Sequence, residues 1–171
     1  MTKTALLLIT ALSALGLALT GCAPGPSAGW TQVVAGQLTL ERPTGWQEQP
    51  APSELWTHRY VGDGMELQIA PLLSEDPTAS AAFSQLDLPA MLHLPDYQGT
   101  GVKKAEVPGA DTAVRSDFSY TEDGVTKRGI WIIAGQYPYP RTAAIAISGE
   151  RLDDGTAQHI IDSLRFTKAR S

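Results

Sequence analysis

The side chains that could carry catalysis or hold a metal are few and scattered. The three histidines stand at positions 58, 93 and 159, a spacing that fits no zinc or heme site, and the chain has one cysteine to add to them. Adjacent carboxylates each fall at an expected turn or helix start, where acidic residues have structural roles: Glu75-Asp76, Glu122-Asp123 and Asp153-Asp154. We therefore expect no catalytic residues, no metal and no cofactor.

Two glycine patterns match known motifs in spacing but not in context. Gly25 to Gly29 has the G-x-S-x-G spacing of a hydrolase nucleophile elbow, yet no strand is expected before it and no helix after it. Gly124 to Gly129 has the spacing of a phosphate-binding loop, but Ile130 stands where a lysine is required. Neither pattern predicts a catalytic or nucleotide-binding site.

Cys22 is the residue with the clearest chemistry. Lys3 begins a leader whose uncharged run from Ala5 to Leu19 is 15 residues long, the length of a signal-peptide h-region. Leu19-Thr20-Gly21-Cys22 then resembles the bacterial lipobox, in which small residues precede the cysteine that receives diacylglycerol before cleavage on its amino side. An uncleaved spanning helix and a buried core cysteine are the alternatives, but a lone cysteine directly after an h-region favours lipidation.

The leader and lipobox predict three parts of the chain. Residues 1–21 are the lipoprotein signal peptide, residues 22–30 a lipidated flexible tether rich in Pro, Gly and Ser, and residues 31–171 one folded domain. Acyl chains such as palmitate on Cys22 would hold the mature protein at the extracytoplasmic face of the cell membrane.

Composition limits the classes of function that remain. With 43% hydrophobic and 18% charged residues the chain has ordinary globular composition. Loss of Lys3 with the leader leaves 12 basic and 18 acidic residues, a net charge of −6. A nucleic-acid binder needs a basic patch to neutralise phosphates, so this class is excluded.

The hydrophobic pattern predicts a largely antiparallel sheet. Apolar residues recur at every second position in short runs separated by Gly, Pro and Asp, and most of the connecting turns are short. The expected strands are Thr31 to Val34, Leu38 to Glu41, Leu55 to Val61, Met65 to Ala70, Gly101 to Val107, Ala113 to Tyr120, Val125 to Ala134 and Thr142 to Ser148.

Two segments have helical spacing instead. Asp76 is the expected N-cap of the first helix, which should end near Asp87, with a short further turn from Ala90 to Leu94. Asp153 or Asp154 should cap the second helix. The expected buried stripes are Ala79, Ala82, Phe83 and Leu86 in the first helix and Ala157, Ile160, Ile161 and Leu164 in the second.

A first hairpin is expected around Gly62-Asp63-Gly64, and its register decides which side chains are buried. If Tyr60 faces Met65, apolar and polar residues sort to opposite faces and Arg59 lies opposite Glu66. The other face then carries the stripe Trp56, His58 and Tyr60. We interpret this stripe as core packing rather than a ligand-binding box.

A second hairpin should turn at Asp123-Gly124, a strong two-residue signal. Its arms place Arg115, Asp117 and Arg128 on one face, where they form either an anion-binding cluster or, as we favour, structural ion pairs. Ile130 to Ile133 is apolar on both faces, which predicts a central strand with Trp131 buried between a helix and the sheet.

Several segments in this order resemble one family, the LpqN/LpqT-type actinobacterial lipoproteins with a PsbP-like fold, over about Gly36 to Phe166. The segments are Pro43-Thr44-Gly45-Trp46, Arg115 to Tyr120, Arg128 to Ile133 and Ile160 to Phe166. The resemblance implies an α+β fold, an α/β/α sandwich with an antiparallel sheet, and relatives that are accessory or partner-binding proteins rather than enzymes. It brings no catalytic residues with it.

Two functional hypotheses follow. The favoured one is a non-catalytic accessory or partner-binding protein of the cell envelope, which needs an exposed apolar patch to bind another envelope protein. The candidate contacts are Tyr137 and Tyr139 in the loop Gly135 to Pro140; the alternative is that both rings fold back onto the sheet edge. The alternative is a carrier or sensor of a small apolar ligand, which needs a cavity of about 300 Å³ or more between sheet and helices.

Overall fold

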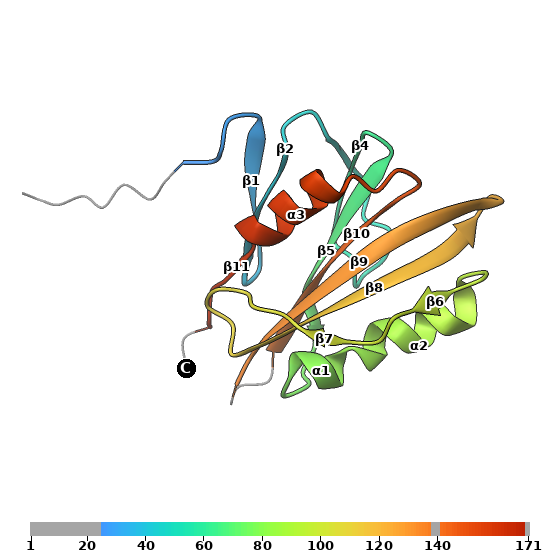
Figure 1. Cartoon of the computed structure of the whole chain (residues 1–171). Coiled ribbons are helices and arrows are strands. Elements are labelled where there is room, and N and C mark those ends of the chain that lie inside the picture. Colours follow the sequence, from blue (N-terminus) through green and yellow to red (C-terminus); the bar gives the residue numbers. More distant parts are fainter. Residues whose placement is uncertain (1–24, 138–140, 170–171) are drawn as a thin grey trace, which may run out of the picture.

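A long antiparallel sheet runs through the middle of the structure (Figure 1), a computed structural model that describes residues 25–137 and 141–169. The strand order is β3-β4-β5-β10-β9-β8-β6, and β7 pairs with β8 as well. The strands are β3 (Gln47–Gln49), β4 (His58–Gly62), β5 (Met65–Ser74), β6 (Gln98–Gly99), β7 (Lys103–Lys104), β8 (Thr112–Glu122), β9 (Val125–Gln136) and β10 (Arg141–Gly149).

Different layers cover the two faces of this sheet. On one face lie helix α3 (Asp154–Ser163) and a small sheet of β1 (Trp30–Ala35), β2 (Leu38–Pro43) and β11 (Arg165–Phe166). On the other face lie helices α1 (Ala79–Ala82) and α2 (Ser84–His93). The expected fold class, a single α+β domain with an antiparallel sheet packed between helices, is confirmed.

Strand β9 explains why the core divides in two. Ile130 and Ile132 belong to the cluster under α3, whereas Trp131 and Ile133 belong to the cluster under α1 and α2. The hairpin from β8 to β9 turns at Asp123-Gly124, as expected, and both of these residues have the positive φ of a type I′ turn. The prediction of a central strand with Trp131 buried is therefore confirmed.

Helix α3 agrees with its sequence pattern. The backbone N–H of Thr156 donates to Asp153 Oδ1 over 2.7 Å, so Asp153 rather than Asp154 is the N-cap. Ala157, Ile160 and Leu164 are buried, and Ile161 is half-buried beside them. This stripe packs against the small and large sheets.

The first helical segment differs from its prediction. Thr78, not Asp76, caps α1, because its hydroxyl accepts from Ala81 N–H, whereas Asp76 accepts from the hydroxyl of Ser74. The prediction that the helix ends near Asp87 is also wrong, since α2 continues through Pro89 to His93. Burial of Leu86 and Ala90 on either side of Pro89 holds this helix on the sheet and outweighs the amide that proline lacks.

The first hairpin has a different register from the predicted one. Tyr60 pairs with Leu67 and Gly62 with Met65, a shift of two residues that leaves a two-residue turn at Asp63-Gly64. A shift of two keeps every side chain on its face, so Arg59 still reaches Glu66. The expected stripe is nevertheless wrong for Trp56, which lies before β4 and packs against the opposite core from Tyr60.

Two of the other expected strands are shorter than predicted. The run Gly101 to Val107 forms only the two-residue β7, and the strand expected from Leu55 begins at His58. Strands β3 and β6 were not expected individually, because both are short and fully exposed and therefore carry no alternating pattern.

Candidate functional site

A groove of about 770 Å³ lies between α2 and the large sheet. We call it the α2 groove. Its inner part is apolar and is lined by residues of the sheet, of α2 and of the segment before β4: Phe118, Trp131 and Ala146, then Leu86 and Ala90, then Leu55 and Trp56. Its volume lies in the range of small-molecule and peptide sites.

Stacked aromatic rings form the floor of the α2 groove. The rings of Phe118 and Trp131 lie 4.2 Å apart, and Tyr120 stacks on Phe118 at 6.0 Å. A Cβ atom at Gly129 would lie 2.2 Å from Cζ of Phe118, so glycine at this position makes room for the ring. The floor therefore offers flat apolar surface, which suits an apolar side chain or ring.

Ion pairs stand at the rim of the α2 groove. Nε and Nη2 of Arg59 both donate to Glu66 Oε2, at 2.8 and 2.6 Å, and Lys127 pairs with Glu122. Hydrogen bonding to these carboxylates raises the pKa of both Arg59 and Lys127. Each of these four charged side chains is already paired with an opposite charge. The rim residues are therefore better suited to contact a bound molecule than to transfer a proton.

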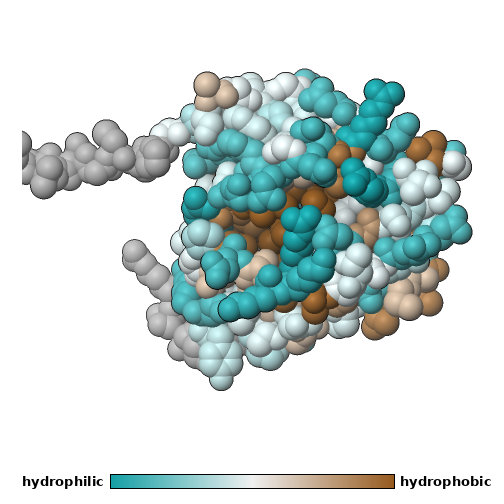
Figure 2. All heavy atoms as spheres, in the orientation of Figure 1, coloured by the Kyte–Doolittle hydropathy of each residue, from teal (hydrophilic) through white to brown (hydrophobic). Residues whose placement is uncertain are grey.

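The outer face of α2 is also apolar. Leu88, Met91 and Leu92 are 57%, 61% and 77% exposed, whereas Leu86 and Ala90 on the inner face are buried. Figure 2 shows brown apolar atoms at the lower right, where α2 lies in Figure 1. A helix that is apolar on all sides is normally covered on all sides, so this exposed face, the α2 patch, is unusual.

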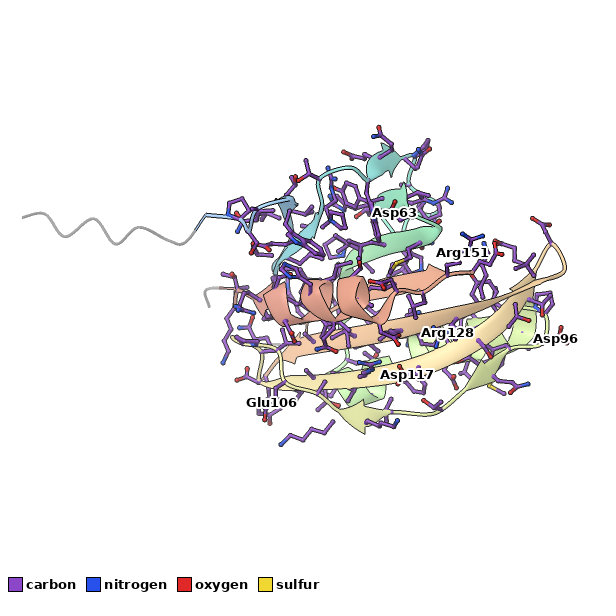
Figure 3. All side chains as sticks on the ribbon, turned by 45° about the horizontal axis from the view of Figure 1, so that its top comes forward. Asp63, Asp96, Glu106, Asp117, Arg128 and Arg151 are labelled. Carbon is purple, nitrogen blue, oxygen red and sulfur yellow. The ribbon has the colours of Figure 1, made fainter. Side chains whose placement is uncertain are left out.

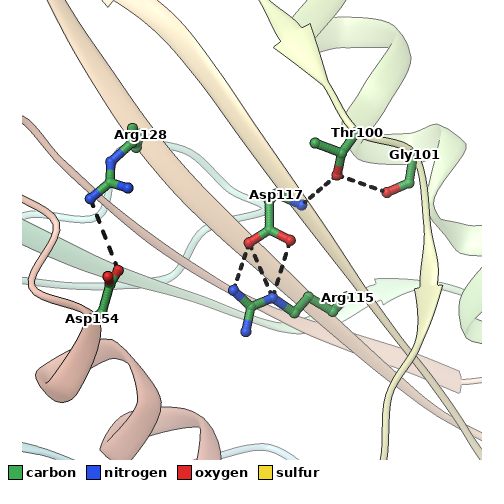
Figure 4. A network of polar contacts seen from close by, with 6 residues as sticks. All are labelled: Thr100, Gly101, Arg115, Asp117, Arg128 and Asp154. Atoms are coloured by element: carbon green, nitrogen blue, oxygen red, sulfur yellow. Dashed lines mark hydrogen bonds and ion pairs between the residues drawn. The ribbon is translucent and has the colours of Figure 1, made fainter.

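The basic and acidic side chains of β8 and β9 form ion pairs rather than an open anion site. Arg115 binds Asp117 through both Nε and Nη2, with the shortest contact 2.6 Å (Figure 4). Arg128 donates to the carbonyl of Leu152 and lies 3.9 Å from Asp154. Figure 3 shows Asp117 and Arg128 on the face of the large sheet that carries α3. The geometry thus favours the structural interpretation of this cluster.

The candidate contact Tyr137 is 62% exposed at the end of β9. Its backbone N–H donates to Asp111 Oδ2 over 2.9 Å, and the hydrogen bond from the Lys168 ammonium, together with this one, holds the pKa of Asp111 below its ordinary value. Tyr139 lies outside the described residues. Tyr137 is therefore exposed, and it is not among the residues that line the α2 groove.

The lipobox residues Leu19, Thr20 and Gly21 and the lipidation site Cys22 also lie outside the described residues. Within residues 25–137 and 141–169, no three His, Cys, Asp or Glu side chains gather as a metal site would require. None of the helices described is long and apolar enough to cross a membrane. Ser27 of the G-x-S-x-G pattern precedes β1, and its N–H donates to Glu41.

Sequence reasoning missed the α2 groove for two identifiable reasons. The alternating pattern predicts Trp56 in a strand, whereas Leu55 and Trp56 precede β4 and line the groove. The expected helix end near Asp87 also separates Leu88 from Met91 and Leu92, although these apolar residues lie on one helix, α2.

Similarity to solved structures extends over most of the chain. LpqN of Mycobacterium tuberculosis, described as involved in cell envelope biogenesis, matches at 17% identity with a TM-score of 0.49, over 81% of this chain and 91% of that one. The Ran-binding protein Mog1p of Saccharomyces cerevisiae matches at 10% identity with a TM-score of 0.54, over 81% and 96%. The likeness to Mog1p shows a shared fold and nothing of function. No family model and no curated protein matches the chain.

Proposed function

We propose that this protein is a non-catalytic accessory protein of the cell envelope, anchored by lipid on Cys22, that binds another envelope protein through the α2 patch. The observation that carries the proposal is helix α2, whose outer residues Leu88, Met91 and Leu92 are exposed although they are apolar. Covering such a surface with a partner removes apolar area from water, which is the main driving force of protein association.

The position of α2 argues for a protein partner rather than the membrane. The tether leads into β1, which belongs to the layer on the face of the large sheet opposite α2 (Figure 1). A lipid anchor on Cys22 therefore attaches the domain to the membrane through the layer that contains β1, not through α2. The α2 helix carries no lysine or arginine to attract anionic lipid, and its titratable side chains are Asp87 and His93.

Site-specific cross-linking in the native host tests this proposal. A photo-reactive residue in place of Met91 should give an adduct with one envelope protein, because it would lie inside the interface. The matched control is Gln32, exposed on β1 in the opposite layer, which should give no such adduct. Leu92→Glu should abolish the Met91 adduct, since a charge in an apolar interface is costly. Identical adducts from both positions would refute the proposal.

A second candidate function, carriage of a small apolar ligand, is favoured by the α2 groove. Its volume of about 770 Å³ and its aromatic floor fit a molecule of drug-like size. Organic extraction of the native lipoprotein, followed by mass spectrometry, should then yield one molecule in stoichiometric amount. Trp56→Ala, which removes one wall, should reduce the yield, whereas an empty extract from the native protein counts against the carrier.

The anchor has its own test. Mass spectrometry of the native protein should show a mature chain that begins at an acylated Cys22. Cys22→Ala should leave the protein unprocessed or released from the membrane with its fold unchanged, because the described elements that form the core begin at Trp30. An intact leader, or a free thiol on Cys22, would contradict the proposed anchor.

A further inference from the structure

A cluster of side chains joins β1, β2 and α3 at the point where the tether enters the domain. The rings of Trp30 and His159 stack, with centroids 3.6 Å apart and planes 14° from parallel. His159 Nε2 lies 2.8 Å from Glu41 Oε2, and the carboxylate of Glu41 is largely shielded from solvent. One imidazole thus contacts both the first residue of β1 and an acid on β2.

The same carboxylate also holds the segment that precedes β1. Glu41 Oε1 accepts from the backbone N–H of Ser27 at 3.1 Å, and the N–H of Trp30 donates to the carbonyl of Ser27 at 3.0 Å. The N–H of Thr44 donates to the carbonyl of Gly29. Residues 27–30 are therefore bound to the domain through Glu41 and its neighbours rather than hanging free from it.

The charge on each partner decides the strength of this cluster. The hydrogen bond from His159 is the main reason why the pKa of Glu41 is lowered. An imidazolium makes a charge-assisted bond to a carboxylate, about twice as strong as its neutral counterpart, and a cation stacked on indole adds further attraction.

Few other charges face His159 from the elements packed against it. On β2, the guanidinium of Arg42 is turned to the carbonyls of Pro43 and Trp46. On α3, Asp162 accepts from the side chain of Gln158. Trp30 on β1 is uncharged. Glu41 is therefore the acid that responds to the charge of His159.

We propose that Trp30, Glu41 and His159 form a pH-dependent tether clamp, which holds residues 27–30 against the domain while His159 is protonated and Glu41 is ionised. Histidine gains its charge just below neutral pH and glutamate loses its charge in acid. The clamp is therefore tightest where the imidazole is charged and the carboxylate, whose pKa is lowered, is still ionised, and it weakens on either side.

Clamping shortens the free part of the tether, an effect on the cell surface that rests on the proposed lipid anchor at Cys22. A fully extended chain spans about 3.3 to 3.6 Å per residue. From Cys22 to a clamped Ser27 the reach is then about 17 Å, against about 27 Å from Cys22 to Trp30, the first residue of β1, after release. Mild acid would hold the domain close to the membrane surface and neutral pH would let it move further away.

Hydrogen–deuterium exchange on the full mature lipoprotein in detergent micelles tests the clamp. The amides of Ser27 and Trp30, corrected for intrinsic exchange at each pH, should be about five-fold more protected near pH 5.5 than at pH 8, because a charged His159 holds the Glu41 carboxylate and the Trp30 ring, to which this segment is bound, more tightly. His159→Gln should remove this pH dependence, and so should Glu41→Gln, a variant of the same shape as glutamate. His93→Gln on α2 is the matched control and should keep it.

Two outcomes would overturn the clamp. One is protection of Ser27 and Trp30 that does not change between pH 5.5 and 8 in the native protein. The other is an unchanged pH dependence in both His159→Gln and Glu41→Gln, with denaturant melts showing that each variant is folded. Neither outcome depends on acylation or on a partner, so the clamp and the proposed function can fail separately.

Discussion

Helices α2 and α3 lie on opposite faces of one sheet, and each has ten residues. They differ in their N-terminal capping and in the polarity of their outer faces. In α3 a side chain caps the first turn, the stripe from Ala157 to Leu164 is buried, and the outer face carries exposed Gln158 and Asp162. In α2 no side chain caps the first residue and the outer face is leucine and methionine. A helix that needs only its own domain has a polar outer face, and this contrast is what supports the proposed binding role of α2.

The largest effect should come from the core beneath α2. Trp131→Ala should lower the free energy of unfolding by about 3 to 5 kcal/mol, because Trp131 is 5% exposed and stacks on Phe118. Denaturant melts measure this loss. A loss below about 1 kcal/mol would show that the α2 side is loosely packed, and the two helices would then differ in packing rather than in function.

The core beneath α3 should respond to a much smaller change. Ile160→Val should cost about 0.5 to 1.5 kcal/mol, since Ile160 is fully buried and the lost methyl leaves a small cavity. Ile161→Val on the half-buried side of the same helix is the matched control and should cost less. Equal losses at the two positions would contradict the burial pattern of α3.

The outer face of α2 should contribute almost nothing to stability. Leu92→Gln should change the free energy of unfolding by less than about 0.5 kcal/mol, because the side chain is 77% exposed. The same variant should lose the cross-linked partner. A large loss of stability with the partner retained would mean that Leu92 serves the fold, and the contrast between the two helices would disappear.

The smallest effect concerns the cap of α3 and appears only in acid. The hydrogen bond from Thr156 N–H lowers the pKa of Asp153, so its contribution is present above pH 3.8 and is lost as pH falls through the lowered pKa. Asp153→Asn, which also caps helices, should match the native protein at pH 7 and depend less on pH between 5 and 2. Melts with equal pH slopes would contradict this.

Helices and strands whose apolar residues repeat regularly could be predicted from the sequence. Features that depend on contacts between distant residues could not. The β8–β9 hairpin, the two-sided strand at Trp131 and the capped α3 follow from alternation, Asp-Gly and a helical stripe. The register at Tyr60 was wrong because a shift of two residues sorts side chains equally well. The α2 groove depends on the packing of Trp56 against the sheet, a long-range contact that no local sequence pattern predicts.

The order of strands in the large sheet also constrains how the chain folds. Strands β8, β9 and β10 are neighbours in sequence and in space, so their meander closes only short loops. Strand β5 must instead find β10 across the sequence, with Ile69 opposite Ile145. We expect the meander to form early and the pairing of β5 to be the slow step. Until that step is complete the α2 groove has only part of its walls, and the folding chain exposes Phe118 and Trp131 to other proteins.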